Sequence, residues 1–256
     1  MEKGIQKTLK EFGEQLLAKP HPIRTKTWQG IDATDLGMLE IRRVSLTYAM
    51  PLGKEALALE LNPNLPWAEN HFQERISGQP LNPGEEYKNW PYYRMDEKMR
   101  NVGEKFSHSY MERFWPKNAW DEDTRPVNGK HVGIRFEYGD LQDVIMLLRK
   151  DRFTRQAYLP VWFPEDTGVV HGKRVPCTLG YLFSIRDNCI DITYYIRSCD
   201  YVRHLRDDIY LAVRLAQYVK SQIDLKLKMG TLLMHIENLH CFSTDTYFIK
   251  KQLEKM

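Results

Sequence analysis

The sequence predicts an α+β fold with one large mixed sheet covered by helices. Three strand-like runs follow one another between residues 155 and 198, and a long helical run and a last strand come after them. Strands and helices mix without strict alternation and without a repeat, which is typical of α+β folds. The chain has 256 residues, 42% of them hydrophobic, which is enough for one sizeable core. We therefore expect residues 1–256 to form a single domain.

The first third of the chain contains two helical segments separated by a strand. In KGIQKTLKEFGEQLLAK (3–19), apolar residues recur on one helical stripe, and the following PHP ends the helix. MLEIRRVSLTYAMP (38–51) alternates apolar and polar residues like a strand. A second helix is expected to begin near Pro66. The loop that follows, over 79–93, is rich in Pro, Gly and aromatic residues, which indicates that it packs on the rest of the protein.

The second half begins with DLQDVIMLLRKD (140–151), an amphipathic pattern that predicts a helix with Asp140 at or near its start. Hydrophobic periodicity then predicts strands, a long helix and a last strand. Their expected ranges are 155–163, 178–188 and 189–198 for the strands, 207–223 for the helix and 230–243 for the last strand.

Composition narrows the class of protein. Charged residues make up 28% of the chain and the formal net charge is +3, which argues against disorder and against a dedicated nucleic-acid surface. The four cysteines form no CxxC pair and no signal peptide precedes them, so we expect a reducing cytoplasm, of a bacterial cell or of an infected host cell. No apolar run approaches the roughly 20 residues of a membrane helix, and we expect no contact with a membrane.

Metal and phosphate-loop motifs are absent from the sequence. His235 and His240 are five residues apart on an expected strand, so their side chains point to opposite faces. That spacing does not suit a shared metal, and no other His, Cys and Asp constellation replaces it, so we expect no metal. Neither GxGxxG nor GKS/GKT occurs. Any nucleotide must be bound by side chains.

Three groups of residues offer chemistry, each with a structural alternative. Cys177 enters a strand next to a proline and three residues after an arginine, and is either a thiolate held by that cation or a buried small hydrophobe. Arg197 and Ser198 would either clamp a phosphate or leave the arginine paired with Asp200. Asp208, the second of two aspartates at a helix start, is either a cap or a carboxylate aimed into a cavity.

Four segments together resemble the thymidylate synthase family of pyrimidine C5 one-carbon transferases. These are PCTLGYLFSIRD, RSCD, RDDIYLA and LHCFS. Twenty residues separate Cys177 from Arg197, and eleven separate Arg197 from Asp208, so that order and gaps agree as well as the letters. The resemblance is good over 154–242.

The resemblance implies a reaction, a co-substrate and an assembly. Cys177 would be the nucleophile that adds to C6 of the pyrimidine, which makes C5 reactive toward the methylene of 5,10-methylenetetrahydrofolate. The substrate would be a pyrimidine nucleoside monophosphate. Family members are homodimers packed through their sheets, and we expect the same here.

The resemblance also implies the residues that bind the nucleotide. Arg197 and Ser198 match the phosphate site. Arg155 matches one of the two arginines that family members donate across the dimer, while Gln156 stands at the position of the other. Arg24 resembles the arginine of the flexible phosphate loop. His240 matches the histidine that holds the sugar hydroxyl, but phenylalanine replaces the tyrosine two residues later, so both CMP and dCMP stay open.

The remaining site residues follow from the same resemblance. Asp200 matches the aspartate that contacts the pterin ring of the folate. Tyr110 resembles a family tyrosine that is followed by glycine, although Met111 follows it here. Glu69 and Glu74 are the two candidates on the helix that carries the family's catalytic glutamate. We prefer Glu74 as the catalytic residue for its distance from Tyr110 and assign Glu69 to the cofactor side.

Asp208 stands where ordinary thymidylate synthases have asparagine. A carboxylate accepts from the amino group of cytosine and shares a proton with N3, whereas it opposes O4 of uracil. This aspartate, and Thr178 after the nucleophile, are closest in pattern to the deoxycytidylate (dCMP) 5-hydroxymethylases, in which water attacks the exocyclic methylene. We therefore expect a (d)CMP 5-hydroxymethylase. The alternatives are a dCMP 5-methyltransferase, a dUMP-specific thymidylate synthase or hydroxymethylase, and a non-catalytic nucleotide- or RNA-binding relative.

Overall fold

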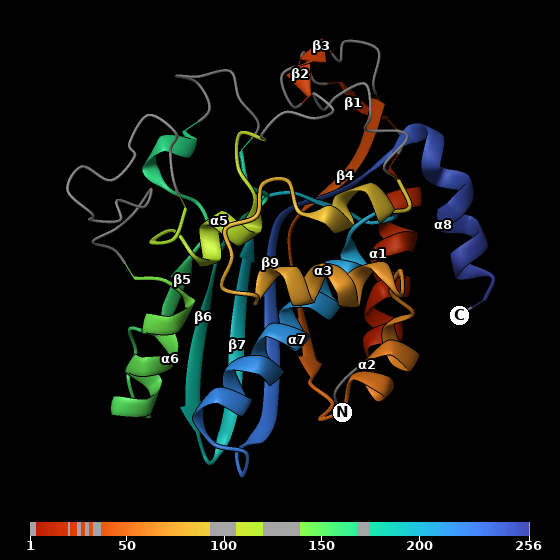
Figure 1. Cartoon of the computed structure of the whole chain (residues 1–256). Helices are drawn as coiled ribbons and strands as arrows, with labels where there is room; N and C mark the ends of the chain where they lie inside the picture. The colour runs from red at the N-terminus through yellow and green to blue at the C-terminus, as the bar shows by residue number, and fades with distance from the viewer. Residues whose placement is uncertain are drawn as a thin grey trace.

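The computed structural model describes residues 4–19, 21–24, 27–28, 31–32, 37–92, 106–119, 139–167 and 175–255. Within these residues, one seven-stranded mixed sheet forms the centre of the molecule (Figure 1). Its strand order is β1 (Ile23–Arg24), β4 (Gly37–Ala49), β9 (Lys228–Phe242), β7 (Cys189–Ile196), β6 (Thr178–Arg186) and β5 (Tyr158–Pro160), with β8 (Cys199–Asp200) paired to β9. A separate pair joins β2 (Thr27–Trp28) to β3 (Ile31–Asp32). The predicted α+β class with one mixed sheet is confirmed.

Helices lie against the sheet on one face (Figure 1). The long helix α7 (Leu205–Ile223) packs on β7 and β9 and contacts α2 (Lys54–Leu61), α3 (Trp67–Arg75) and α6 (Leu141–Lys150). On β4 lies α1 (Ile5–Leu17), which in turn carries α8 (Thr246–Leu253). The short elements are α5 (Tyr110–Phe114) and the 3-10 turns η1 (Glu85–Asn89), η5 (Pro164–Asp166) and η6 (Ser243–Asp245). No helix of the described ranges combines the length and apolarity that a membrane crossing requires.

The expected elements appear with shifted bounds. The helix predicted over 207–223 begins two residues earlier, and only three residues of the range 155–163 form a strand. The sequence analysis did not predict α2, α5 or α8. In the loop over 79–93, Tyr87 and Trp90 are buried, so the predicted packing of its aromatic residues is confirmed.

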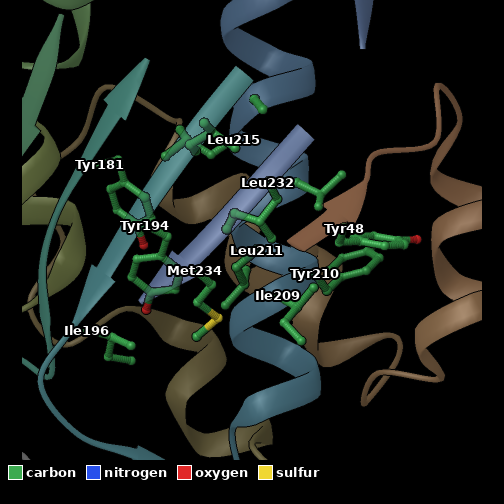
Figure 2. Close-up of a cluster of buried hydrophobic side chains, with 14 of the residues drawn as sticks. Tyr48, Tyr181, Tyr194, Ile196, Ile209, Tyr210, Leu211, Leu215, Leu232 and Met234 are labelled. Atoms are coloured by element: carbon green, nitrogen blue, oxygen red, sulfur yellow. The ribbon is translucent and has the colours of Figure 1, made fainter. Parts of the chain in front are cut away.

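The core lies between α7 and the sheet. Burial alternates strictly along β7, which follows from the period-two geometry of a strand with one face covered. Figure 2 shows side chains of β6, β7, α7 and β9 meeting there, with Tyr181 stacked on Tyr194 at 4.6 Å between ring centroids. On α7, Leu211 and Leu215 are one helical turn apart and almost fully buried. Each such leucine stabilises the fold by about 2 kcal/mol.

The other face of the sheet carries no helix of the described ranges. A row of partly exposed residues crosses five strands in register, from Tyr158 on β5 to Thr47 on β4, through Leu182, Thr193 and Leu233. In the next row, the ring of Tyr195 stacks on that of His235, beside Ser45.

The helix α6 begins with a capping box, as its sequence predicts. The Asp140 side chain accepts from the backbone N–H of Asp143 at 3.1 Å, and the Asp143 carboxylate accepts from the backbone N–H of Asp140 at 2.8 Å. Two N–H groups that the helix cannot pair internally are thereby satisfied.

Replacing Asp140 with alanine removes one acceptor of this box. We expect Asp140→Ala to lower the free energy of unfolding by about 1 kcal/mol, as typical N-cap truncations do. Urea unfolding measures the change. Asp140→Ser keeps a side-chain acceptor and should retain most of the stability, and equal losses in both variants would contradict the capping role.

Candidate active site

Cys177 lies in the segment that leads into β6, and Arg197 holds the main chain of that segment. The backbone N–H of Arg197 donates to the carbonyl oxygen of Cys177 at 2.9 Å. Its guanidinium donates through Nε to the carbonyl of Pro176 at 2.9 Å and through Nη2 to that of Val175 at 3.3 Å. Nη1 makes no hydrogen bond within the described residues. The cation therefore lies beside the thiol segment.

The two aspartates at the start of α7 have different partners. Asp207, 1% exposed, accepts from the backbone N–H of Asn64 at 2.8 Å and from its side-chain Nδ2 at 2.7 Å. Asp208 instead accepts from the thiol of Cys199 on β8, at 3.5 Å. The N-cap of α7 is His204, and no side chain makes a capping hydrogen bond there. Capping by Asp208 is thus not observed, while Asp207 ties α7 to the loop before α3.

Asp208 is partly buried, and its environment sets an unusual charge state. Burial raises the pKa of Asp208 to about 7, and the like charges of Asp207 and Asp200 act in the same direction. The positive charge of Arg75 and the hydrogen bond from Cys199 oppose this rise. Burial also raises the pKa of the Cys199 thiol well above its ordinary value, so the thiol stays protonated and donates. Near neutral pH, Asp208 is therefore both a proton donor and an acceptor.

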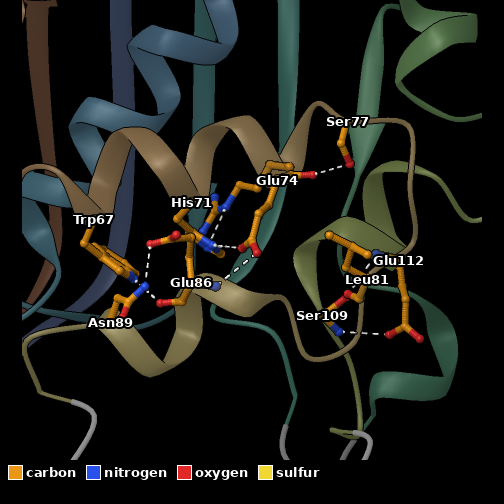
Figure 3. A network of polar contacts seen from close by, with 10 residues as sticks. Trp67, His71, Glu74, Ser77, Leu81, Glu86, Asn89, Ser109 and Glu112 are labelled. Atoms are coloured by element: carbon orange, nitrogen blue, oxygen red, sulfur yellow. Dashed lines mark hydrogen bonds and ion pairs between the residues drawn. The ribbon is translucent and has the colours of Figure 1, made fainter.

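Tyr110 reaches the same region from α5. The Thr178 hydroxyl donates to the Tyr110 hydroxyl at 3.1 Å and lies 2.8 Å from the hydroxyl of Tyr194. Ser109 caps α5 and forms a capping box with Glu112, which fixes the helix that carries the phenol (Figure 3). Burial raises the pKa of Tyr110 well above its ordinary value. The phenol next to Thr178, and so one residue from Cys177, is neutral.

The two glutamates of α3 are held by different neighbours. Glu69 accepts from the Tyr210 hydroxyl and from two nitrogens of Arg214, each at 2.8 Å, which ties α3 to α7. Glu74 accepts from the backbone N–H of Glu86 at 3.0 Å and lies 3.3 Å from Nδ1 of His71 (Figure 3). Burial opposes ionisation of both, but hydrogen bonds outweigh it and lower both pKa values. Both are ionised, and their assigned roles stay predictions.

Asp200, Ser198 and His240 lie together because β8 pairs in parallel with β9 and aligns Asp200 with His240. The Ser198 hydroxyl lies 3.5 Å from Nδ1 of His240. Asp200 accepts from the backbone N–H groups of Val202 and Arg203, both at 2.9 Å. Burial lowers the pKa of His240 to about 4 and raises that of Asp200 to about 6. The histidine is thus neutral at physiological pH.

The two outlying arginines occupy exposed positions. Arg155 precedes β5, which is an edge strand of the sheet. Arg24 ends β1, where the register aligns Ile23 with Met38 and Met38 with Phe242. Arg24 therefore lies at the same end of the sheet as His240. The contacts of both arginines with phosphate stay predictions.

Comparisons with known proteins bear directly on this arrangement. A family model described as thymidylate synthase matches residues 82–256, about two thirds of the chain. The chain belongs to the thymidylate synthase family. A "Putative thymidylate synthase" of Methanococcoides burtonii is 26% identical over 168 residues, which cover 63% of this chain and 67% of that protein. Membership supports a folate-dependent one-carbon transferase acting on C5 of a pyrimidine. The resemblance inferred from the motifs is confirmed at the level of the family.

Sequence reasoning in terms of family motifs missed one residue, Arg75. It is the last residue of α3, 6% exposed, and its guanidinium carbon lies 4.1 Å from the centre of the Tyr110 ring. A signal was present, since Arg75 continues the buried stripe of Ala68 and Phe72 at helical spacing. A cation on the apolar side of a helix indicates a buried partner.

Asp208 should make stability depend on pH. Its folded-state pKa, about 7, exceeds the ordinary value of 3.8. The stability that its protonated form provides is therefore lost as pH rises from about 4 to about 7. Relative to Asp208→Asn, the natural protein should lose about 2 kcal/mol of unfolding free energy between pH 5 and pH 8, allowing for solvent screening. Urea unfolding at both pH values measures this, and parallel pH dependence in the two proteins would contradict it.

Proposed function

We propose that this protein is a cytosine nucleotide C5 one-carbon transferase, a (d)CMP 5-hydroxymethylase that uses 5,10-methylenetetrahydrofolate. The observation that carries the proposal is the carboxyl of Asp208, which replaces an amide in ordinary family members. A carboxyl group with a pKa of about 7 is partly protonated at neutral pH. It can donate to N3 of cytosine and accept from the exocyclic amino group at once.

The chemistry follows from these groups. The Cys177 thiolate forms a bond to C6, the ring electrons shift toward N3, and Asp208 supplies the proton that N3 takes up. C5 becomes electron-rich and accepts the one-carbon unit, which the folate supplies. C5 then loses its proton, and the bond between the methylene carbon and the folate nitrogen breaks, so that tetrahydrofolate leaves. Water adds to the exocyclic methylene that remains, the Cys177 thiolate leaves C6, and N3 returns its proton to Asp208. A pKa near 7 suits an acid that works at neutral pH.

The residues around Asp200 fit a pterin ring. The carbonyl oxygen of Asp200 accepts from the backbone N–H of His204 at 3.0 Å. Trp90 stacks on His204 with ring centroids 4.8 Å apart, and the ring of Tyr92 is 5.4 Å from that of Trp90. Trp90, Tyr92 and His204 thus form an aromatic cluster beside the turn that follows Asp200, and we propose that the pterin ring packs here.

The sugar contact fits either a ribonucleotide or a deoxyribonucleotide. The Phe242 ring lies 4.4 Å from the guanidinium carbon of Arg203 and is 5% exposed. This packing leaves His240, with the adjacent Ser198, to meet the sugar. We include both CMP and dCMP as substrates in the proposal, and place the reaction in the cytoplasm.

We also propose that 1–256 is one domain that works as a homodimer packed through the sheet face without helices. Pairing of β4 with β9 joins the first fifth of the chain to its end. On the open face, Tyr195 stacks on His235 at 5.5 Å, and the Ser45 hydroxyl lies 2.8 Å from Nδ1 of that histidine. Such rows of aromatic and aliphatic residues suit a second copy, to which Arg155 would contribute.

The reaction is tested by tritium release from C5-labelled dCMP, CMP and dUMP with methylenetetrahydrofolate. We expect release from a cytosine nucleotide, and a loss of about 10² to 10⁴-fold in Asp208→Asn with a shift toward dUMP. Product chromatography should then show the 5-hydroxymethyl nucleotide. Preference of the natural protein for dUMP would overturn cytosine selection, dihydrofolate formation would indicate a methylase, and no release from any nucleotide would indicate a non-catalytic relative.

The assembly is tested by sedimentation velocity. Leu233→Glu places a charge in the middle of the open face and should convert a dimer to a monomer, because a buried unpaired carboxylate is costly. Leu59→Glu is the matched control, since Leu59 lies on α2 and is 86% exposed. A natural protein that sediments as a monomer, or a dimer that survives Leu233→Glu, would contradict this interface.

A further inference from the structure

Arg75 is a buried cation that the mechanism above does not use. It ends α3, where a positive charge suits the negative end of the helix dipole. The Trp115 indole donates to its backbone carbonyl at 2.8 Å, so the main chain at this point is fixed. A long charged side chain is rarely this buried without a specific partner.

A hydrogen-bonded pair from the same helix orients the guanidinium. Arg75 Nε is an N–H donor and lies 3.1 Å from Nε2 of His71, so this ring nitrogen must be the acceptor. The ring proton then sits on Nδ1 and points to the Glu74 carboxylate at 3.3 Å. His71 also stacks on Trp67, with ring centroids 5.2 Å apart and planes 13° apart (Figure 3). Glu74, His71 and Arg75 therefore form a fixed chain with one tautomer.

The guanidinium of Arg75 packs on the ring of Tyr110. Its carbon is 4.1 Å from the centre of the Tyr110 ring, whose hydroxyl accepts from Thr178, the residue after Cys177. Within the described residues its two terminal nitrogens make no hydrogen bond. Their donors remain available on the side of Tyr110.

The charged and titratable groups that interact electrostatically with Asp208 come from six elements. They are Arg75 of α3, Tyr110 of α5, Tyr181 of β6, Tyr194 of β7, Cys199 and Asp200 of β8, and Asp207 of α7. All but Arg75 are acidic groups, and a negative charge on any of them would oppose ionisation of Asp208. Arg75 is the cation of this set, and its charge, together with the hydrogen bond from Cys199, favours the carboxylate.

We propose that Arg75 is a positioning residue that stabilises the carboxylate formed when Asp208 gives its proton to N3 of the base. The inference rests on the proposed function. As Cys177 bonds to C6, the proton leaves Asp208 and a negative charge appears in a part-buried site. A cation already fixed by Glu74 and His71 meets that charge without reorganisation.

The arrangement predicts where the effect of Arg75 appears. In the reactive form, with Asp208 protonated, the carboxylate forms only as the proton is transferred, so the contact is stronger in the transition state than in the complex with substrate. Loss of Arg75 should lower kcat and leave KM nearly unchanged. Activity on a cytosine nucleotide should fall as pH rises through the pKa of Asp208. This fall, the alkaline limb of the pH profile, should shift to higher pH when the cation is removed.

We would compare Arg75→Gln, Arg75→Lys and the natural protein by tritium release from C5-labelled dCMP and CMP between pH 5.5 and 9. Arg75→Gln should lower kcat by about 10 to 100-fold and raise the alkaline limb by about one pH unit, since loss of a nearby opposite charge shifts a carboxyl by one to three units. Arg75→Lys keeps the charge and should restore much of both.

Arg113→Gln is the matched control. Arg113 is also a buried arginine over an aromatic ring, 4.4 Å from that of Phe163, and pairs with Asp166 at 2.7 Å. Its loss should lower Tm without moving the alkaline limb. If Arg75→Gln keeps the natural kcat and limb, or behaves like Arg113→Gln, the positioning role is wrong while the proposed function stands.

A second measurement does not depend on activity. Urea unfolding at pH 5 and pH 9 gives the stability that a protein loses between the two pH values. The part due to Asp208 is the difference between a protein and the same protein with Asp208→Asn. In Arg75→Gln this part should be larger by about tenfold in the unfolding equilibrium constant. An unchanged loss would overturn the inference. Absence of tritium release from the natural protein would count against the proposed function separately.

Discussion

The parallel pairing of β7 with β9 is the constraint on which the site depends. Parallel neighbours cannot be joined by a tight turn, so the chain must cross over the sheet between them, and α7 is that crossover. The crossover begins at the end of the sheet where β7 ends. Arg197, Asp200 and Asp208 therefore lie at the same end of the sheet, although eleven residues separate the first from the last. The antiparallel pairing of β6 with β7 brings Cys177 to this same end of the sheet.

Burial then gives this end of the sheet its chemical character. The Tyr181 and Tyr194 rings stack beneath it, and the Thr178 hydroxyl connects Tyr194 to Tyr110. A water-poor environment of aromatic rings disfavours charge, which is why the pKa of Asp208 rises to about 7. Burying ionisable groups here raises the free energy of the folded state, and the packing of α7 on the sheet offsets this. Asp207 contributes directly, because its carboxylate anchors the loop before α3.

Sequence patterns predicted the long periodic elements. Helix α2 was missed because its two buried residues, Leu57 and Leu61, make too short a stripe, and β8 because two residues carry no periodicity. The motifs located Cys177, Arg197 and Asp208 along the chain, but their contacts come from strand register that no local pattern encodes. Arg75 was missed for the same reason, since its partner Tyr110 lies on another helix, 35 residues away. Local periodicity indicates burial and not what lies opposite.

The charge balance of the site suits an anionic substrate. Burial keeps His240 neutral and holds the pKa of Asp200 near 6 and that of Asp208 near 7, so the acidic groups carry less negative charge than their number implies. Arg75 and Arg197 supply positive charge next to these groups. In the proposed reaction, the nucleoside monophosphate enters with negative charge on its phosphate, and protonated Asp208 gains negative charge as the base takes its proton. In this proposal the two cations act at different steps of one reaction: Arg197 when the phosphate binds, and Arg75 when the carboxylate forms.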